Sequence, residues 1–333
     1  MKWLLRILAA GLLLAALVAG AAWQWIERPM PLQGERAEVS IEAGMTPREI
    51  AQQWVSAGVD VPPEWLYQWF RWSGEARRIR AGSYEIESGT SPRALLDKMV
   101  RGAQSLEQLR LIEGWSFSQV RLALAKAPGL RPTLQNLSDA EAARALGMAE
   151  GTSIEGWLFP DTYSYSKGVS DLTVLQRAHA AMQRRLAEVW DGRAQPTPLQ
   201  TPQDLLVLAS VIEKETGQAS DRGQIAGVFI NRLRIGMPLQ SDPTVIYGMG
   251  PRFDGNLRRS DLQTDNAWNT YTRRGLPATP IALPGLAALR AAARPEATTA
   301  LYFVARGDGS SAFSSNLSDH NRAVNQFQRG SSR

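Results

Sequence analysis

Three adjacent charged residues, Glu213, Lys214 and Glu215, have the types and the setting that acid–base chemistry requires. The run 205–216 carries no charge before them, so they would close the last turn of a helix whose body is buried. Thr201-Pro-Gln-Asp204 supplies the N-cap, the N1 proline and the N3 carboxylate that start such a helix. A carboxylate at a buried helix end has a raised pKa, as a general acid near neutral pH needs.

Helical geometry separates the three charges. At about 100° per residue, Glu215 lies beside the apolar stripe that runs through Leu208 and Ile212. Glu213 lies further round, and Lys214 faces the opposite side. Glu215 is therefore the carboxylate that we expect to enter a buried cleft, although spacing alone favours a solvated Glu-Lys-Glu helix end over a catalytic site.

Polar and turn-forming residues follow the next predicted helix, which runs from Ser220 to Ile235. The sequence predicts loops at 237–248, 269–271 and 275–277, where amides and aromatic rings of the kind that bind sugars are frequent. Further upstream, Ile112-Glu-Gly-Trp115 recurs as Ile154-Glu-Gly-Trp157, but two copies are too few to indicate a repeat architecture.

The N-terminus reads as a membrane anchor. The basic residues Lys2 and Arg6 precede an uncharged stretch, residues 7–26, which is about 30 Å long as a helix and matches a bilayer core. Trp23 and Trp25 stand at its far end, where interfacial aromatic residues are favoured. We expect residues 1–6 in the cytoplasm, a single span at 7–26, and the body outside the cytoplasm.

A cleaved signal peptide is the alternative for this segment, because Ala19-Gly20-Ala21 resembles a cleavage site for a signal peptidase. The stretch is longer than a usual signal-peptide core, which favours a retained anchor. Both interpretations export the rest of the chain.

Composition narrows the class of the body. With 333 residues, 44% of them apolar and 21% charged, the chain is long enough for two or three folded units. The net charge of +5 is spread along the chain without a nucleic-acid-binding motif, so we expect no nucleic-acid partner. The absence of cysteine excludes disulfides and thiolate catalysis, and His179 and His320 are too far apart in sequence to suggest a metal site.

Residues 36–105 have the pattern of a small α+β module. Strand-like runs at Ala37–Ile41 and Ala81–Ile86 enclose a helix that opens at Thr46, where Pro47 and Glu49 complete a capping box. A second capped helix follows from Ser91 to Val100.

Several long motifs, in the same order along the chain, resemble those of the endolytic murein transglycosylases of the MltG (YceG-like) family. They are Glu155–Tyr163, Ala209–Thr216, Val228–Leu233, Met237–Tyr247, Asn269–Tyr271, Gly275–Pro277, Leu301–Ala305 and His320–Asn321. The resemblance extends from the N-terminal anchor to near the C-terminus.

This resemblance implies an α+β chain: the transmembrane helix, a LysM-like module at 36–105, and a mixed α/β catalytic domain at 106–330. It makes Glu215, the second glutamate of Glu-Lys-Glu-Thr, the catalytic residue, with no cofactor and no metal. It implies a substrate-binding cleft formed by Gln240, Asp242, Thr244, Asn269 and Tyr271.

Two positions depart from the family pattern. Ser311 stands where the family often has histidine, so no proton transfer is assigned to that position. Pro277-Ala-Thr-Pro280 replaces a Pro-Pro-Gly-Pro run, which we expect to change the shape of the loop more than its chemistry.

The implied activity is non-hydrolytic cleavage of the β-1,4 bond between N-acetylmuramic acid (MurNAc) and N-acetylglucosamine (GlcNAc) in peptidoglycan, which leaves a 1,6-anhydroMurNAc end. The implied role is to terminate nascent glycan strands at the inner (cytoplasmic) membrane, with the catalytic body in the periplasm, alongside penicillin-binding-protein synthases. A water-using muramidase and a non-catalytic peptidoglycan-binding scaffold are the alternatives.

Overall fold

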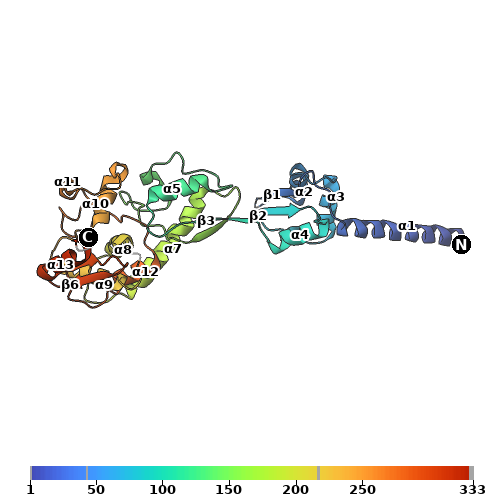
Figure 1. The fold of residues 1–333 in the computed structure, drawn as a ribbon. Coiled ribbons are helices and arrows are strands. Elements are labelled where there is room, and N and C mark those ends of the chain that lie inside the picture. The colour runs from blue at the N-terminus through green and yellow to red at the C-terminus, as the bar shows by residue number, and fades with distance from the viewer. Residues whose placement is uncertain (1, 43, 216–217, 330–333) are drawn as a thin grey trace. The chain divides into compact units, whose positions relative to one another are not determined.

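The computed structural model describes residues 2–42, 44–215 and 218–329, which form two compact units (Figure 1). Unit 1 comprises the described residues up to Glu107 together with 128–131 and 164–169, and unit 2 comprises the rest. The predicted domain limits, 36–105 and 106–330, would assign those two short segments to the second domain. These limits stay a prediction.

Unit 1 consists of a long helix followed by a small α+β body. β1 and β2 pair antiparallel, with Val39 opposite Tyr84, and their buried faces pack with Trp54 and Phe70 of the helices in one apolar core. Its elements are α1 (Lys2–Glu27), β1 (Arg36–Ile41), α2 (Pro47–Ser56), α3 (Pro63–Trp72), the 3₁₀ turn η1 (Ala76–Arg78), β2 (Gly82–Glu87) and α4 (Pro92–Arg101).

Local sequence signals explain where these elements begin. The predicted capping box is confirmed, because Glu49 N donates to Thr46 Oγ1 at 3.3 Å and Thr46 N donates to Glu49 Oε2 at 2.6 Å. Ser91 caps α4 in the same way, since Ala94 N donates to its Oγ at 3.2 Å. The predicted strands and both capped helices are present.

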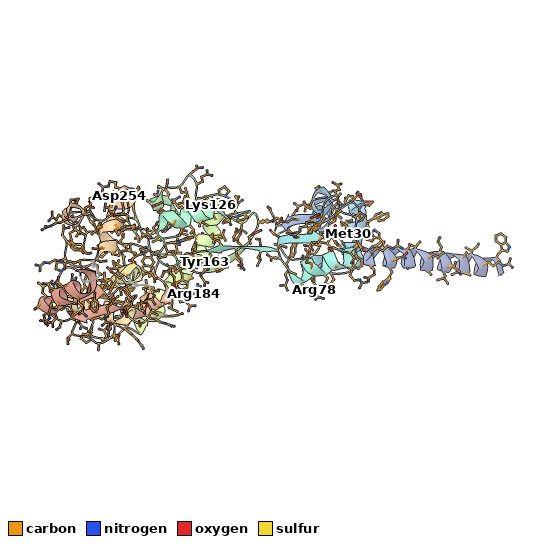
Figure 2. All side chains as sticks on the ribbon, in the orientation of Figure 1. Met30, Arg78, Lys126, Tyr163, Arg184 and Asp254 are labelled. Atoms are coloured by element: carbon orange, nitrogen blue, oxygen red, sulfur yellow. The ribbon has the colours of Figure 1, made fainter. Side chains whose placement is uncertain are left out.

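α1 contains the predicted span 7–26. Its segment Arg6–Glu27 is long and apolar enough to cross a membrane. The described side chains of this segment are mostly exposed, and Figure 2 shows them projecting from a helix that extends beyond the body of unit 1. Only at its last turn does the chain enter that body, where Ile26 and then Met30 are buried.

Unit 2 is mainly helical, with short strand pairs. β5 pairs antiparallel with β6, and β3 forms a two-stranded sheet with β4. Its elements, with the strands shared with unit 1 included, are β3 (Leu106–Arg110), α5 (Phe117–Lys126), α6 (Asp139–Ala145), β4 (Thr162–Ser166), α7 (Asp171–Asp191), α8 (Pro202–Glu215), α9 (Arg222–Arg234), α10 (Asp242–Met249), η2 (Gly250–Arg252), α11 (Arg259–Gln263), α12 (Leu286–Ala293), β5 (Tyr302–Ala305), β6 (Ser311–Ser314), α13 (Leu317–Val324) and the π-helical turn η3 (Asn325–Arg329).

α8 is the central helix of this unit, as its apolar sequence predicts. Every residue from Leu205 to Ile212 is buried, and the helix packs against α7, α9, α10 and α12. Its start is held as expected, since Asp204 N donates to Thr201 Oγ1 at 3.1 Å and Thr201 N donates to Asp204 Oδ2 at 2.9 Å. Thr216, the last residue of the expected helix, lies outside the described residues.

The predicted loop at 237–248 is only partly a loop. Asp242–Met249 forms α10, with Ser241 at its N-cap and Pro243 in its first turn. The expectation was wrong there because proline and serine also signal a helix start, and Val245, which is buried, supplies the packing that fixes the helix.

Candidate active site

Glu215 is the last residue of α8, and its side chain is only half-buried. Lys214 is exposed, as the helical geometry predicts, and its Nζ donates to Gly114 O at 3.3 Å. Glu213 is half-buried too, so geometry alone does not single out Glu215 as the carboxylate that enters the protein.

The partners of the two glutamates separate their roles. Glu213 Oε2 accepts a hydrogen bond from the backbone of Gly285, the N-cap of α12, at 2.9 Å. A carboxylate at a helix N-terminus stabilises that helix. Glu213 therefore serves the packing of α8 against α12, whereas Glu215 has a side-chain partner from another segment.

That partner is Ser241, whose Oγ donates a hydrogen bond to Glu215 Oε1. Ser241 is only 1% exposed, and its own N–H donates to Thr270 Oγ1 at 3.0 Å. Although Ser241 stands at the N-cap of α10, its hydroxyl does not cap that helix. The serine is thus fixed by the backbone and directed at the carboxylate.

The surroundings raise the pKa of Glu215 to about 7. Burial is the largest cause, because it disfavours the charged carboxylate, and the nearby negative charge of Asp242 adds to it. The hydrogen bond from Ser241 and the positive charge of Arg232 act in the opposite direction. A carboxyl group with this pKa can donate a proton near neutral pH and take one back.

Arg232 supplies a buried positive charge to this site. It is 6% exposed, and its guanidinium donates to Leu301 O and to Leu239 O, both at 2.7 Å. The same group lies 5.3 Å from the ring centroid of Tyr302. Burial lowers the pKa of Arg232, and the negative charge of Glu215 is among the influences that raise it again.

Helical spacing in the sequence indicates that Arg232 is buried, but the prediction of site residues from motifs did not include it. It lies three residues after Phe229 and four after Val228, both buried, so helical spacing places it on the buried face of α9. Ser241 carried no such signal, because its contact with Glu215 spans 26 residues of chain and depends on tertiary packing.

Three of the predicted binding residues, Gln240, Asp242 and Tyr271, lie around Ser241 and keep surface accessible. Tyr271 Oη donates to Asp242 Oδ1 at 2.5 Å, and burial together with this bond raises the pKa of the tyrosine. Gln240 has a φ of 51°, which is uncommon outside glycine, and its N–H donates to Thr270 O at 3.1 Å. Strained backbone of this kind concentrates at functional sites.

The other two predicted residues, Thr244 and Asn269, are fully buried. Thr244 Oγ1 donates to Ser241 O at 2.6 Å, which holds the first turn of α10. Asn269 Nδ2 donates to Leu262 O at 3.1 Å and to Thr264 O at 2.8 Å, while its Oδ1 accepts from Tyr271 N at 2.8 Å. Both residues fix the segments that carry Ser241 and Tyr271.

A second buried carboxylate, Glu155, lies in the motif at 155–163. It accepts bonds from Phe117 N at 3.0 Å and from the Tyr247 hydroxyl at 3.2 Å, and burial raises its pKa to about 7. Because Tyr247 belongs to α10, Glu155 links the turn before residue 157 to the helix whose N-cap is Ser241. Its surroundings are closed, which suits a structural role.

Ser311, which departs from the family pattern, lies in β6, and its N–H donates to Asp221 Oδ2 at 2.5 Å. His320 of the same region stacks on Tyr302 with ring centroids 5.1 Å apart. Burial and the charge of Arg232 lower the pKa of His320. Among the described residues, no group of three or more histidines, aspartates or glutamates could hold a metal ion.

The fold has a solved relative. The crystal structure of a YceG-like protein from Listeria monocytogenes superposes with a TM-score of 0.56 and 27% identity, and the match covers 86% of this chain and 98% of that one. A sequence profile of the YceG-like family matches residues 39–326, and this chain belongs to that family.

Two relatives carry a functional name. A Bacillus subtilis protein named endolytic murein transglycosylase is 30% identical over 283 residues, which are 80% of this chain and 78% of the relative. A Streptococcus pneumoniae protein of the same name is 26% identical over 319 residues, which are 86% of this chain but only 57% of the longer relative. The family expected from the motifs is confirmed.

Proposed function

We propose that this chain is an endolytic peptidoglycan lytic transglycosylase in which Glu215 is both general acid and general base. The observation that carries the proposal is the half-buried Glu215, with a pKa of about 7 and a hydrogen bond from Ser241. Membership of the YceG-like family and two relatives named endolytic murein transglycosylase support it.

The proposed reaction breaks the β-1,4 bond between MurNAc and GlcNAc. Protonated Glu215 donates its proton to the glycosidic oxygen, and positive charge develops at C1 of MurNAc. The resulting carboxylate takes the proton of the C6 hydroxyl of the same sugar as that oxygen attacks C1. The product is a 1,6-anhydroMurNAc end, and no water is consumed. Most glycosidases need a second carboxylate, but the substrate's own hydroxyl replaces it here.

The remaining site residues have supporting roles in this proposal. Ser241 holds Oε1 of Glu215, which leaves Oε2 to carry the proton, and its hydrogen bond strengthens once Glu215 is charged. Gln240, Asp242 and Tyr271 would bind the glycan directly. Thr244 and Asn269 would act through the segments that they fix, because their polar atoms are engaged inside the protein.

The cellular role extends the same proposal. With α1 as a single-pass anchor in the inner membrane and unit 2 in the periplasm, the enzyme would cut new strands near the membrane and so terminate their elongation. Penicillin-binding-protein synthases are the proposed partners. The order strand, two helices, strand in unit 1, with β1 and β2 paired, supports a LysM-like module.

Digestion of purified sacculi tests the activity. The wild-type chain should release muropeptides that end in anhydroMurNAc, each lighter than its hydrolysed counterpart by one water, as read by mass spectrometry. Glu215→Gln should abolish this release, whereas Glu213→Gln, which alters the neighbouring carboxylate of the same helix turn, should retain it. Products with reducing ends would identify a muramidase, and binding of sacculi without any cleavage by the wild type would identify a scaffold.

A further inference from the structure

The outer face of α3 carries two exposed tryptophans. Trp65 is 54% exposed and Trp72 is 76% exposed. They are seven residues apart, so two helical turns place them on one side of the helix. Outside α1, Leu106 is the one other large apolar side chain in the described part of unit 1 with comparable exposure. We call Trp65 and Trp72, together with Trp23 of α1, the tryptophan face.

This face is continuous with the end of α1. The rings of Trp25 and Trp65 meet edge to face with centroids 5.6 Å apart. Arg93 of α4 lies 4.7 Å from the ring centroid of Trp23 and forms a salt bridge with Glu27 at 2.6 Å. In Figure 1, α3 lies at the end of unit 1 from which α1 leaves. α3 is therefore held beside the last turn of the apolar helix.

The position of α1 indicates how deep in the membrane the tryptophan face would lie. If α1 spans a membrane, Trp23 and Trp25 end the span at the level of the lipid headgroups. Trp65 touches Trp25 and so lies at the same level. Tryptophan is favoured at this depth because its ring is apolar and its N–H is polar. Met30, labelled in Figure 2, is buried just beyond α1, so the chain between helix and body is packed rather than free.

Arginines are frequent on α3 and in the segment that follows it. Residues 63–80 contain four arginines and two glutamates. A groove between α2 and α3 is lined by Arg48, Arg71 and Arg77, all of them exposed. Within the described chain, Arg71 and Arg77 form no ion pair, so their charges are available to an anion. The phosphates of anionic phospholipids are the anions present at this depth.

We propose that unit 1 lies on the membrane surface through α3. The tryptophan face enters the headgroup layer of the membrane that α1 spans, and the arginines of the groove bind the phosphates of anionic lipids there. This inference rests on the proposed anchoring by α1. It gives unit 1 two attachments to one membrane, which fix its orientation and not only its distance from the bilayer.

Nitroxide labelling of the full chain tests the inference, and the absence of cysteine makes single labels simple. One label is placed at Gln68→Cys, between the two tryptophans of α3, and a matched label at Ser40→Cys, exposed near the far end of β1. The chain is reconstituted in nanodiscs of phosphatidylglycerol and phosphatidylethanolamine. Collision rates with oxygen, which concentrates in lipid, and with a water-soluble nickel chelate are measured by electron paramagnetic resonance.

The ratio of oxygen to nickel collisions should be several-fold higher at position 68 than at position 40. It should fall toward the value at position 40 in a Trp65→Gln/Trp72→Gln background. The ratio at position 68 should fall in part when Arg71→Gln/Arg77→Gln removes two arginines. It should also fall in part when the discs contain phosphatidylcholine alone. Ile235→Gln, which removes an exposed apolar side chain of unit 2, should leave it unchanged.

Equal ratios at positions 68 and 40 in a chain retained by the disc would overturn the inference and leave the anchor intact. Loss of the chain from the disc would overturn both. A chitin oligosaccharide that shields position 68 in detergent, with no shielding by lipid, would make the face a sugar-binding surface and also overturn the inference. Sacculus digestion, measured in parallel, tests the proposed enzymatic activity, and its outcome does not depend on any of these three results.

Discussion

The hydroxyl of Ser241 donates a hydrogen bond to Oε1 of Glu215 and thereby joins the N-cap of α10 to the last residue of α8. The bond stabilises the carboxylate form, whereas burial and Asp242 favour the neutral acid. The balance leaves Glu215 with a pKa of about 7, so small changes in these neighbours should shift the pH range of the proposed reaction.

Ser241→Ala should raise the pKa of Glu215, because the carboxylate loses its donor. A hydrogen bond to a charged group contributes roughly 1.5–3 kcal/mol, so the pKa should rise by about one or more. Activity falls as Glu215 loses its proton, and the alkaline limb of the pH–rate profile should therefore move to higher pH. The rate on the plateau should fall about tenfold, since the charged form that follows proton transfer is no longer stabilised.

The profile is measured as release of anhydroMurNAc ends between pH 5 and 9. Ser260→Ala, in α11, is the control and should reproduce the wild-type curve. An unchanged profile for Ser241→Ala would mean that the serine has no influence on the proton of Glu215.

Asp242→Asn should move the alkaline limb of the pH–rate profile to lower pH, opposite to the effect of Ser241→Ala. The negative charge of Asp242 raises the pKa of Glu215, so its removal lowers that pKa and activity is lost at lower pH. The change should be smaller than that of Ser241→Ala, because Asp242 is exposed and its charge is screened. Asparagine can still accept the bond from Tyr271, so the geometry is kept.

Asp265→Asn serves as the control for this change of charge, because Asp265 is paired with Arg273 at 2.8 Å instead. A displacement of the limb of equal size in both variants would indicate a general effect of surface charge.

The sequence predicted the family through its motifs and the central helix through local signals, whereas the catalytic role of Glu215 followed from the family resemblance and stays a prediction. The Thr201 helix start, the uncharged run to Ile212 and the Glu-Lys-Glu end are readable over 15 residues. The capping boxes of unit 1 are local in the same sense.

What the sequence could not predict depends on contacts between distant segments. Ser241 and Glu215 meet only because α10 packs on α8. Thr244 and Asn269 belong to the right motifs, yet polarity alone does not tell whether a side chain faces a ligand or a buried carbonyl. Both side chains are fully buried, which supports the proposal that they act on neighbouring segments.

Asn269→Ala should therefore act on stability first. It leaves the carbonyls of Leu262 and Thr264 and the N–H of Tyr271 without their partner, at a cost of about 3 kcal/mol in stability for three part-buried hydrogen bonds. Thermal unfolding of the full chain in detergent should show a lower midpoint, while Asn256→Ala, at an exposed position, should not change it. An unchanged midpoint combined with a raised KM would make Asn269 a direct ligand of the glycan.

Glu155→Gln should make stability less dependent on pH. The pKa of Glu155 is raised from 4.5 to about 7, so the folded state binds more protons than the unfolded state between these values. The contribution of Glu155 to stability is therefore greatest below pH 4.5 and is lost as the pH rises to about 7. Between pH 4.5 and 8, the free energy of unfolding of Glu155→Gln should rise by about 3 kcal/mol relative to that of wild type. The reason is that each tenfold change in proton affinity corresponds to about 1.4 kcal/mol.

Glu141→Gln provides a control of opposite sign for this measurement. Hydrogen bonds from Ser138 lower the pKa of Glu141, so its contribution is present above pH 4.5 and lost at lower pH. Unfolding midpoints of both variants and of wild type at several pH values test the pair. A constant difference between Glu155→Gln and wild type would show that Glu155 is not titrating in this range.

Gly114 and Gly156, the glycines of the two Ile-Glu-Gly-Trp copies, should differ in their tolerance of alanine. Both have left-handed backbones, with φ of 76° and 78°. An alanine in this conformation destabilises the fold by about 1–2 kcal/mol. A Cβ on Gly114 would meet nothing nearer than Lys214 Cδ at 3.7 Å, whereas a Cβ on Gly156 would overlap Pro280. Steric overlap in a packed site destabilises the fold by about 1–3 kcal/mol more.

Gly156→Ala should thus lower the unfolding midpoint clearly more than Gly114→Ala does. Gly156→Ala should also reduce glycan cleavage, because Pro280 precedes Ile281, whose N–H donates to Ser210 of α8 at 3.0 Å, and displacement of that segment disturbs the helix that carries Glu215. Equal midpoints for the two variants would mean that the segment at Pro280 yields without cost, and that the second copy of the motif has no closer packing role than the first.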